Sequence, residues 1–239
     1  MIDGRRILVV VPARGGSQGI KLKNLREVGG MPLVARVGHV VRELPFVDRA
    51  VVSTDHEQIA EVAMQSGLAA PFRRPEALSG PRIGDLDVLT HALAEMERLD
   101  GCVYDVTVML QPTSPTRTPA QVERAIRKLI EEDLDAVWTV SETDSKAHPL
   151  KQLTIDPQGT LSLYDQAGAR IIARQQLQPV YHRNGIAYVF TRQALMQART
   201  ILPARTGAVL IEEPVANIDT ELDLAWANFL LTSGTLESN

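Results

Sequence analysis

The chain has 239 residues, of which 44% are hydrophobic and 23% are charged, and its net charge is −4. These values are typical of a globular protein and exclude a general electrostatic attraction to nucleic acid. The single cysteine, Cys102, excludes an intrachain disulfide, and neither a signal peptide nor an apolar run of membrane-spanning length is recognised. The sequence predicts one cytoplasmic domain over 1–239 without a nucleic-acid or membrane partner.

Strand-like and helix-like segments alternate along the chain, which predicts an α/β fold with a mostly parallel sheet flanked by helices. Strands are expected at 5–11, 49–53, 105–110, 135–140, 186–190 and 207–211. Helices are expected at 32–44, 56–66, 86–99, 119–132, 192–200 and 221–231. Pro32 and Pro119 suit the first turn of their helices. Asp55 is expected to cap the helix that starts at His56, and Gly67 to end it.

The loop that follows the first strand predicts a nucleotide site. Residues 5–11 form an apolar run typical of a buried parallel strand, and the loop at 12–24 is rich in glycine. Glycines let the backbone approach a ligand, and Arg14, Lys21 and Lys23 add fixed positive charge. Open α/β sheets bind their ligands beyond the carboxyl ends of strands. The pattern therefore favours a polyphosphate ligand at this loop.

Other interpretations of this loop fit less well. The Gly-Lys-Ser/Thr element of P-loop ATPases is absent, and no helix opens directly after the glycines as in a dinucleotide fingerprint. Residues 15–19 match the Gly-x-Ser-x-Gly elbow of hydrolases, but Ser17 lies in a stretch without helical periodicity. A surface loop without a ligand is the remaining alternative, and its three positive charges would repel one another.

Residues 142–182 interrupt the alternation of strands and helices. Two short runs, 153–155 and 160–163, flank a turn that contains proline and glycine, which predicts a β-hairpin. The segment is too polar and irregular for another strand–helix unit. We interpret it as a small β-rich arm inserted in the main domain, and an ordinary surface hairpin is the alternative.

Five segments in order along the chain carry a resemblance to one enzyme family. They read PARGGSQGIKLKN at 12–24, VSTD at 52–55, LQPTSPTR at 110–117, RNGIAY at 183–188 and NIDTELD at 217–223. With them the chain resembles the acylneuraminate cytidylyltransferases, the CMP-sialic acid synthetases and their relatives for other nine-carbon acidic sugars. The resemblance implies a Rossmann-like nucleotide-diphospho-sugar transferase fold. It also implies a nucleotidyltransferase that converts CTP and an acidic 2-keto sugar to a CMP-sugar and pyrophosphate.

The resemblance also implies the residues of the nucleotide site, which are Ala13, Arg14, Gly15, Ser17, Lys23, Asn24 and Arg74. Arg14 offers planar bidentate donors for phosphate, and Lys23 offers a point charge. Together with Asp219 they are the expected catalytic residues. Arg74 is expected near the cytosine, with a solvated loop arginine as the alternative. Gln18 replaces a family lysine, whose charge Lys21 is placed to supply.

Asp219 and Asp223 are the expected ligands of a Mg²⁺ cofactor. Mg²⁺ takes one or two carboxylates together with phosphate oxygens and water. Asp219 matches the second aspartate of the family's Asp-Ile-Asp-Thr motif, and Asn217 stands where some members have the first. Asp223 has a second interpretation, because Thr220 to Asp223 fits the capping box of a helix start.

The sugar site implied by the resemblance contains Gln111, Ser114, Lys151, Arg174, Arg183, Asn184 and Tyr188. In the family the arm makes a dimer contact and reaches the partner's active site, so we expect a homodimer with Arg174 contributed across its interface. His182 and Pro81 depart from the sialic acid enzymes, which leaves the identity of the sugar open.

Two alternatives to this function stay open. One is an enzyme for the eight-carbon acid KDO, although the chain lacks the first-loop motif of those enzymes. The other is a non-catalytic relative that binds nucleotide, a possibility raised by Gln18 and Asn217. The intact Arg14, Lys23 and Asp219 argue against it.

Overall fold

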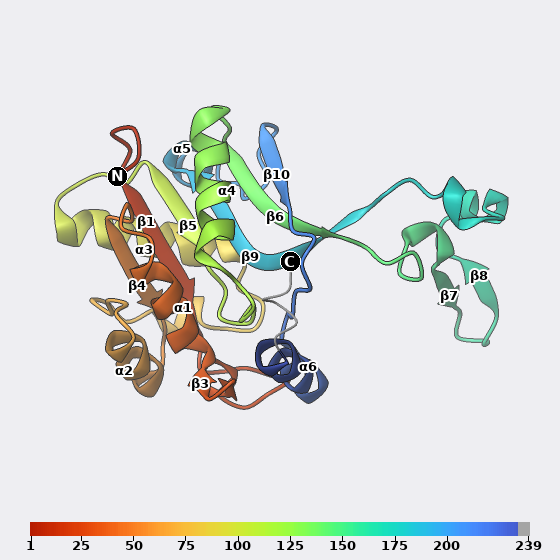
Figure 1. The fold of residues 1–239 in the computed structure, drawn as a ribbon, viewed down its shortest axis with the longest axis horizontal. Coiled ribbons are helices and arrows are strands. Elements are labelled where there is room, and N and C mark those ends of the chain that lie inside the picture. Colours follow the sequence, from red (N-terminus) through yellow and green to blue (C-terminus); the bar gives the residue numbers. More distant parts are fainter. Residues whose placement is uncertain (234–239) are drawn as a thin grey trace.

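A computed structural model describes residues 1–233 and shows a mostly parallel six-stranded sheet (Figure 1). Its strands in spatial order are β10 (Thr206–Leu210), β6 (Ala136–Glu142), β9 (Tyr181–Thr191), β5 (Val106–Met109), β1 (Ile7–Pro12) and β4 (Arg49–Ser53). Only β9 among these strands runs antiparallel to its neighbours, β5 and β6. The expected α/β fold is therefore confirmed.

Helices cover both faces of this sheet, and their bounds are α1 (Leu33–Arg42), α2 (Glu57–Gln65), α3 (Asp85–Asp100), α4 (Pro119–Glu131), α5 (Arg192–Met196) and α6 (Glu221–Thr232). One apolar core joins the sheet to α1, α2 and α4, and a second joins it to α3 and α5. None of the helices within residues 1–233 has the length and apolar character needed to span a membrane.

The alternation of side chains along β1 explains these two cores. Ile7, Val9 and Val11 enter the core under α1, α2 and α4, whereas Leu8 and Val10 enter the core under α3. All five side chains are fully buried. An apolar run without polar alternation is what a strand covered on both faces requires. Because β1 lies between β5 and β4, the loop that follows it lies at the sheet's carboxyl edge between the ends of those two strands.

A third apolar cluster holds that loop against α6. Ile20 of the loop packs with Ile218, which precedes α6, and with Leu224 of the helix itself. The short antiparallel pair β2 (Glu27–Val28) and β3 (Met31–Pro32) contributes Val28 to the same cluster. Segments nearly 200 residues apart in the chain thus meet beneath the basic loop.

The arm lies away from the sheet, on the extended ends of β6 and β9 (Figure 1). Its hairpin is present as β7 (Leu153–Ile155) and β8 (Leu161–Leu163), close to the expected runs. Three short 3₁₀ helices complete it, at Pro149–Lys151, Gln166–Arg170 and Arg174–Gln176.

The structure corrects two expected element bounds. Strand β9 begins at Tyr181 rather than 186, because residues 181–183 pair with the end of β6 beyond a bulge at Trp138. These residues are polar or exposed, so they lack the apolar pattern of a strand. Helix α5 ends at Met196 rather than 200, and Arg199 just beyond it takes a left-handed conformation with φ of 52°.

Two expected helix ends are also corrected. Asp55 does not cap α2, whose N-cap is His56 without a side-chain hydrogen bond; Asp55 instead accepts a hydrogen bond from the N–H of Gly15. Pro32 is the N-cap of α1 rather than a first-turn residue. The other two helix ends are as expected. Pro119 opens α4 behind the Thr118 cap, and Gly67 follows α2 with φ of 98°.

Candidate functional site

A cavity of about 580 Å³ opens beyond the carboxyl ends of β1 and β5. Four stretches of the chain line it. The first loop contributes Arg14 and Lys23, and the segment that leads into α3 contributes Arg74 and Asp85. The loop after β5 contributes Gln111, and the segment before α6 contributes Asp219. Five of the seven predicted nucleotide residues, the predicted metal ligand Asp219 and the expected sugar ligand Gln111 therefore share one cavity, whereas Ala13, Gly15 and Asp223 are not in its lining. Three basic and two acidic side chains in the lining make it strongly polar.

The first loop is fixed by contacts to neighbouring segments. The N–H of Gly15 donates to Asp55 Oδ1 at 2.8 Å, and the Asn24 side-chain amide donates to the Arg14 carbonyl at 3.0 Å. A Cβ on Gly19 would lie 2.5 Å from the Asp219 carbonyl oxygen, so only glycine allows this approach of the two segments. The Asn24 amide therefore shapes the loop, and its role in binding nucleotide stays a prediction.

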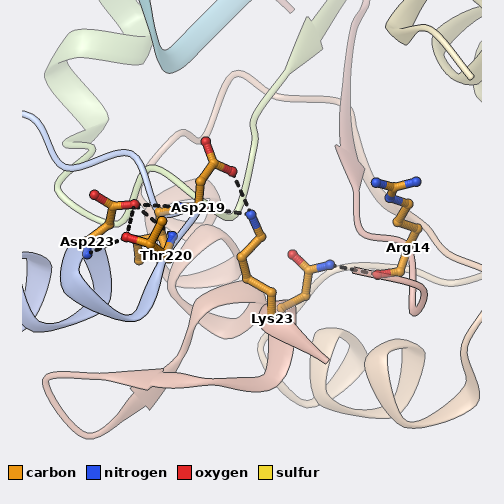
Figure 2. Close-up of polar contacts among 7 residues, drawn as sticks. Arg14, Lys23, Asp219, Thr220 and Asp223 are labelled. Atoms are coloured by element: carbon orange, nitrogen blue, oxygen red, sulfur yellow. Dashed lines mark hydrogen bonds and ion pairs between the residues drawn. The ribbon is translucent and has the colours of Figure 1, made fainter. Parts of the chain in front are cut away.

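Lys23 and Asp219 both line the cavity and form an ion pair (Figure 2). Lys23 Nζ donates to Asp219 Oδ1 at 2.8 Å and to the Ile218 carbonyl at 2.7 Å. The lysine side chain is 14% exposed and the aspartate side chain is 76% exposed. The pair therefore holds the ammonium group in a fixed place while the carboxylate faces solvent, where it is accessible to a cation or a ligand.

The Arg74 side chain is a buried cation. It is 4% exposed, and neither its Nε nor its Nη2 has a hydrogen-bond partner within residues 1–233. Burial lowers its pKa, the charge of Asp55 opposes that effect, and the charge of Arg14 adds to it. Buried donors without acceptors are costly, so a ligand with acceptor atoms would satisfy them. This observation favours the ligand-binding interpretation of Arg74 over a solvated loop arginine.

Asp223 caps α6 and does not line the cavity (Figure 2). Its Oδ2 accepts from the N–H of Thr220 at 2.7 Å, from the Thr220 hydroxyl at 2.8 Å and from the N–H of Asp219 at 3.0 Å. The Asp223 N–H in turn donates to the Thr220 hydroxyl, which completes a capping box. These contacts support the capping interpretation of Asp223 and leave its metal role without structural support.

The cap gives a pH-dependent prediction. The hydrogen bond from the Thr220 hydroxyl, followed by that from the Asp219 N–H, lowers the pKa of Asp223. A carboxylate with a lowered folded-state pKa stabilises the protein above its unfolded pKa of about 3.9, and the contribution is lost as pH falls through the folded-state pKa. We expect Asp223→Asn to lower the free energy of unfolding at pH 7 by about 0.5–2 kcal/mol.

Urea unfolding of wild type and Asp223→Asn across pH measures this effect. The difference between the two proteins should be complete at neutral pH and should shrink below pH about 4, where the wild-type carboxylate becomes protonated. A difference that stays constant down to pH about 2 would contradict the assignment of the charge to the cap.

Arg117 was not among the expected site residues, although it ends the LQPTSPTR motif. Its buried guanidinium donates to the Gln111 carbonyl at 2.7 Å, to the Gly185 carbonyl at 2.8 Å and to the Ile186 carbonyl. Burial lowers the pKa of Arg117 to about 9. These bonds join the loop after β5 to the middle of β9 and thereby fix the backbone of Gln111 beside the cavity.

Three expected sugar ligands, Ser114, Asn184 and Tyr188, form the wall behind Gln111 instead of lining the cavity. The Ser114 hydroxyl donates to the Asn184 carbonyl at 3.0 Å, and Asn184 Oδ1 accepts from the Thr139 hydroxyl at 2.7 Å. The Tyr188 hydroxyl accepts from the N–H of Gly185 at 2.9 Å. These buried polar groups satisfy one another, which gives them a structural role that the motif alone could not reveal.

The remaining expected sugar ligands lie on or near the arm. Lys151 and Arg174 are exposed there, and Arg174 lines a separate cavity of about 400 Å³ at the base of the arm. Arg183 lies at the start of β9, 5.4 Å from the centre of the Trp138 ring, a cation–π distance. Within a single chain the structure therefore does not bring Lys151 or Arg174 to the main cavity.

The donor set of the cavity is compatible with one hard cation. Within residues 1–233 no three His, Cys, Asp or Glu side chains cluster as a metal site. Mg²⁺ needs fewer protein ligands when substrate phosphates supply the others. Asp219 offers a second carboxylate oxygen that makes no hydrogen bond in the described chain, and Asn217 lines the same cavity.

Comparisons with known proteins place these observations in context. A family model described as Cytidylyltransferase matches residues 8–224. The chain is 30% identical to the CMP-N,N'-diacetyllegionaminic acid synthase of Legionella pneumophila, over 98% of this chain and 97% of that protein. It is 28% identical to the pseudaminic acid cytidylyltransferase of Campylobacter jejuni, over 93% and 95% of the two chains. A solved CMP:2-keto-3-deoxy-manno-octonic acid synthetase complexed with CTP is 17% identical, with a TM-score of 0.70 over 95% and 99% of the two chains, and shares the fold.

Proposed function

The chain belongs to the cytidylyltransferase family, and from this premise we propose that it activates a nine-carbon, sialic-acid-like acidic sugar with CTP. The products are the CMP-sugar and pyrophosphate. The single observation that carries the proposal is the polar cavity at the sheet edge, where Lys23, Arg74 and Asp219 lie together. Relatives named for CMP-legionaminic acid synthesis and pseudaminic acid cytidylyl transfer support a nonulosonic acid as the acceptor.

The residues of the cavity suit a displacement at phosphorus. The anomeric hydroxyl of the sugar attacks the α-phosphorus, a new P–O bond forms, the bond to pyrophosphate breaks, and the hydroxyl proton leaves. Such reactions depend on positioning and on neutralising the triphosphate charge, and need no covalent enzyme intermediate. Arg14 and Lys23 supply cationic donors on the first loop, and the pairing with Asp219 keeps the Lys23 ammonium in place.

A Mg²⁺ ion is part of the proposal. Asp219 would hold it through its exposed carboxylate, with the Asn217 side chain as a neutral oxygen donor nearby in the lining. When bound, the ion would neutralise phosphate charge during transfer. Because Asn217 carries no charge, this chain relies on Asp219 and the nucleotide's own oxygens for most of the attraction.

Nucleotide choice is the first prediction. Arg74 has buried unpartnered donors, which suit the acceptor atoms of cytosine. We expect kcat/KM for CTP to exceed that for ATP or GTP by about 10²-fold or more, because a site built for hydrogen bonds rejects ligands that leave its groups unpaired. A pyrophosphate-release assay with each of the four nucleotides, Mg²⁺ and a panel of acidic 2-keto sugars measures this ratio.

The same panel separates the competing functions. Turnover of nine-carbon acids with little use of KDO supports the proposal, and the reverse preference supports the KDO alternative. Nucleotide binding without pyrophosphate release from any acid would indicate a non-catalytic relative. Equal use of purine nucleotides would contradict the assignment of Arg74 to cytosine.

We also propose a cytoplasmic homodimer in which the arm completes the partner's sugar site. The arm exposes a series of apolar side chains, which are Leu153, Ile155, Leu161, Tyr164 and Ile172. An isolated two-stranded hairpin is marginally stable in water, and exposed apolar patches mark interaction surfaces. The arm extends away from the sheet (Figure 1), and Lys151 and Arg174 are exposed on it, so these cationic side chains are available to a second copy. The cytoplasm is where CTP is supplied.

A further inference from the structure

The cavity has an order along the edge of the sheet. Arg74 lies beside the end of β4, where its N–H donates to the Thr54 carbonyl at 2.9 Å. Arg14 follows β1, the neighbour of β4, and Gln111 follows β5, the next strand of the sheet. Strand β9 adjoins β5 on the side away from β1. If the base binds at Arg74 and the phosphates bind at Arg14, the part of the cavity beside β5 and β9 is left for the sugar.

Asp85 lies in that region. It is the first residue of α3 and lines the cavity. The charge of Arg183, on β9, lowers the pKa of Asp85 against the larger effect of burial, which raises it. The charge of Asp85 in turn helps to raise the pKa of Tyr188, which is also on β9. The pKa of Arg74 is affected by other charges, those of Asp55 and Arg14. Asp85 therefore lines the cavity within the electrostatic reach of two residues of β9, Arg183 and Tyr188.

The Asp85 carboxylate has no hydrogen bond or ion pair within bonding distance anywhere in the described chain. Asp87, two residues further along the same first turn, differs in this respect. Its carboxylate is 48% exposed and pairs with Arg199 at 3.4 Å. The negative charges of both aspartates stabilise the N-terminus of the helix. This shared effect does not explain why only Asp85 of the two lines the cavity. The Asp85 carboxylate is therefore open to a hydrogen-bond donor from a ligand in the cavity.

We propose that Asp85 is a specificity-determining residue of the sugar subsite, whose carboxylate accepts a hydrogen bond from a hydroxyl or amide N–H group of the bound acidic sugar. This inference rests on the proposed function. Asp85 also orients the sugar, because its negative charge repels the sugar's own carboxylate and leaves that group to the cationic side chains. A bond from a neutral donor to a carboxylate is charge-assisted and strong enough to select among sugar substituents.

The test compares Asp85→Asn with Asp87→Asn, a matched change on the same helix turn that does not touch the cavity. For the acid that the wild type uses best, we expect Asp85→Asn to lower kcat/KM by about 10- to 100-fold through the sugar KM, with the CTP KM nearly unchanged. Asp87→Asn should leave both constants near wild type. Thermal unfolding of the three proteins shows whether stability accounts for any loss.

Sugar analogues locate the donor. Analogues that lack one hydroxyl or acylamino N–H at a time should include one that the wild type uses about 10- to 100-fold less well, and this penalty should nearly vanish in Asp85→Ala, which has no acceptor oxygen at this place. A penalty that persists for every analogue would overturn the inference. So would a loss in Asp85→Asn that falls on CTP or on the Mg²⁺ requirement, or that matches Asp87→Asn and follows a lower melting temperature.

The failure of this inference is distinguishable from failure of the proposed function. A wild type that releases pyrophosphate with an acidic sugar, but whose sugar KM is unchanged by Asp85→Asn, overturns only the role of Asp85. A wild type that turns over no acidic sugar overturns both.

Discussion

Replacing Asp219 by asparagine is expected to lower kcat by about 10²-fold or more, with saturating CTP and sugar, a loss comparable with that of one strong electrostatic contact. Asparagine is nearly the same size as aspartate, but it lacks the negative charge that pairs with Lys23 Nζ at 2.8 Å. The wild-type Asp219 side chain is 76% exposed, so the change also removes a carboxylate that faces solvent. The change thus affects both the fixed ammonium group and the proposed Mg²⁺ ligand. The loss should be accompanied by a higher Mg²⁺ concentration for half-maximal activity.

Asp223→Asn is the matched control for this experiment. It changes the same functional group four residues away, at a helix cap outside the cavity. We expect it to reduce stability and to change turnover only severalfold, because Asp223 positions Asp219 through a single N–H bond of 3.0 Å. If Asp223→Asn abolished turnover while Asp219→Asn were active, the roles of the two carboxylates would be reversed.

The fold was predictable where local patterns coincide with burial. The apolar run of β1 is fully buried between two layers, and Pro119 and the Thr220–Asp223 capping box begin α4 and α6 as expected. The prediction failed where tertiary pairing overrides local pattern. Residues 181–183 are polar or exposed, and they become strand only because the end of β6 lies beside them.

The sequence predicted which residues gather at the candidate site better than it predicted what each of them does there. The first loop, Arg74, Gln111 and Asp219 do share one cavity, which their motifs indicate through their positions at strand ends. Ser114 and Asn184 occur in the same motifs but bond to each other behind the cavity. A motif marks residues that a family keeps together, and it does not distinguish a ligand from the wall that supports it.

The local sequence does not predict the structural positions of two further residues, Arg117 and Asp85. Arg117 reads as an ordinary charged residue before a helix cap, yet it is buried and bonded to three carbonyl groups. Asp85 reads as one of two acidic residues in a helix first turn. Only the folded chain shows that one of the two faces the cavity, because the packing of α3 against β9 is a contact between distant segments.

Arg174→Ala is expected to raise the sugar KM by about 10²-fold while the CTP KM stays nearly unchanged, since an arginine paired with a carboxylate supplies strong bidentate bonds. The acidic sugar needs a cationic donor that the triphosphate does not already occupy. Arg174 is exposed on the arm and does not line the main cavity of its own chain. The proposed homodimer therefore requires that its guanidinium acts in the partner's site.

A subunit hybrid tests that requirement directly. In a dimer of one Arg174→Ala subunit and one Lys23→Ala subunit, the first subunit has an intact Lys23 and receives the intact Arg174 of the second. One composite site is whole and the other is doubly defective, so hybrids purified with two tags should recover about half the wild-type activity per dimer. If each chain used its own arm, both sites would be defective and no activity would return. Full activity from a protein that sediments as a monomer at the assay concentration would also refute the composite site.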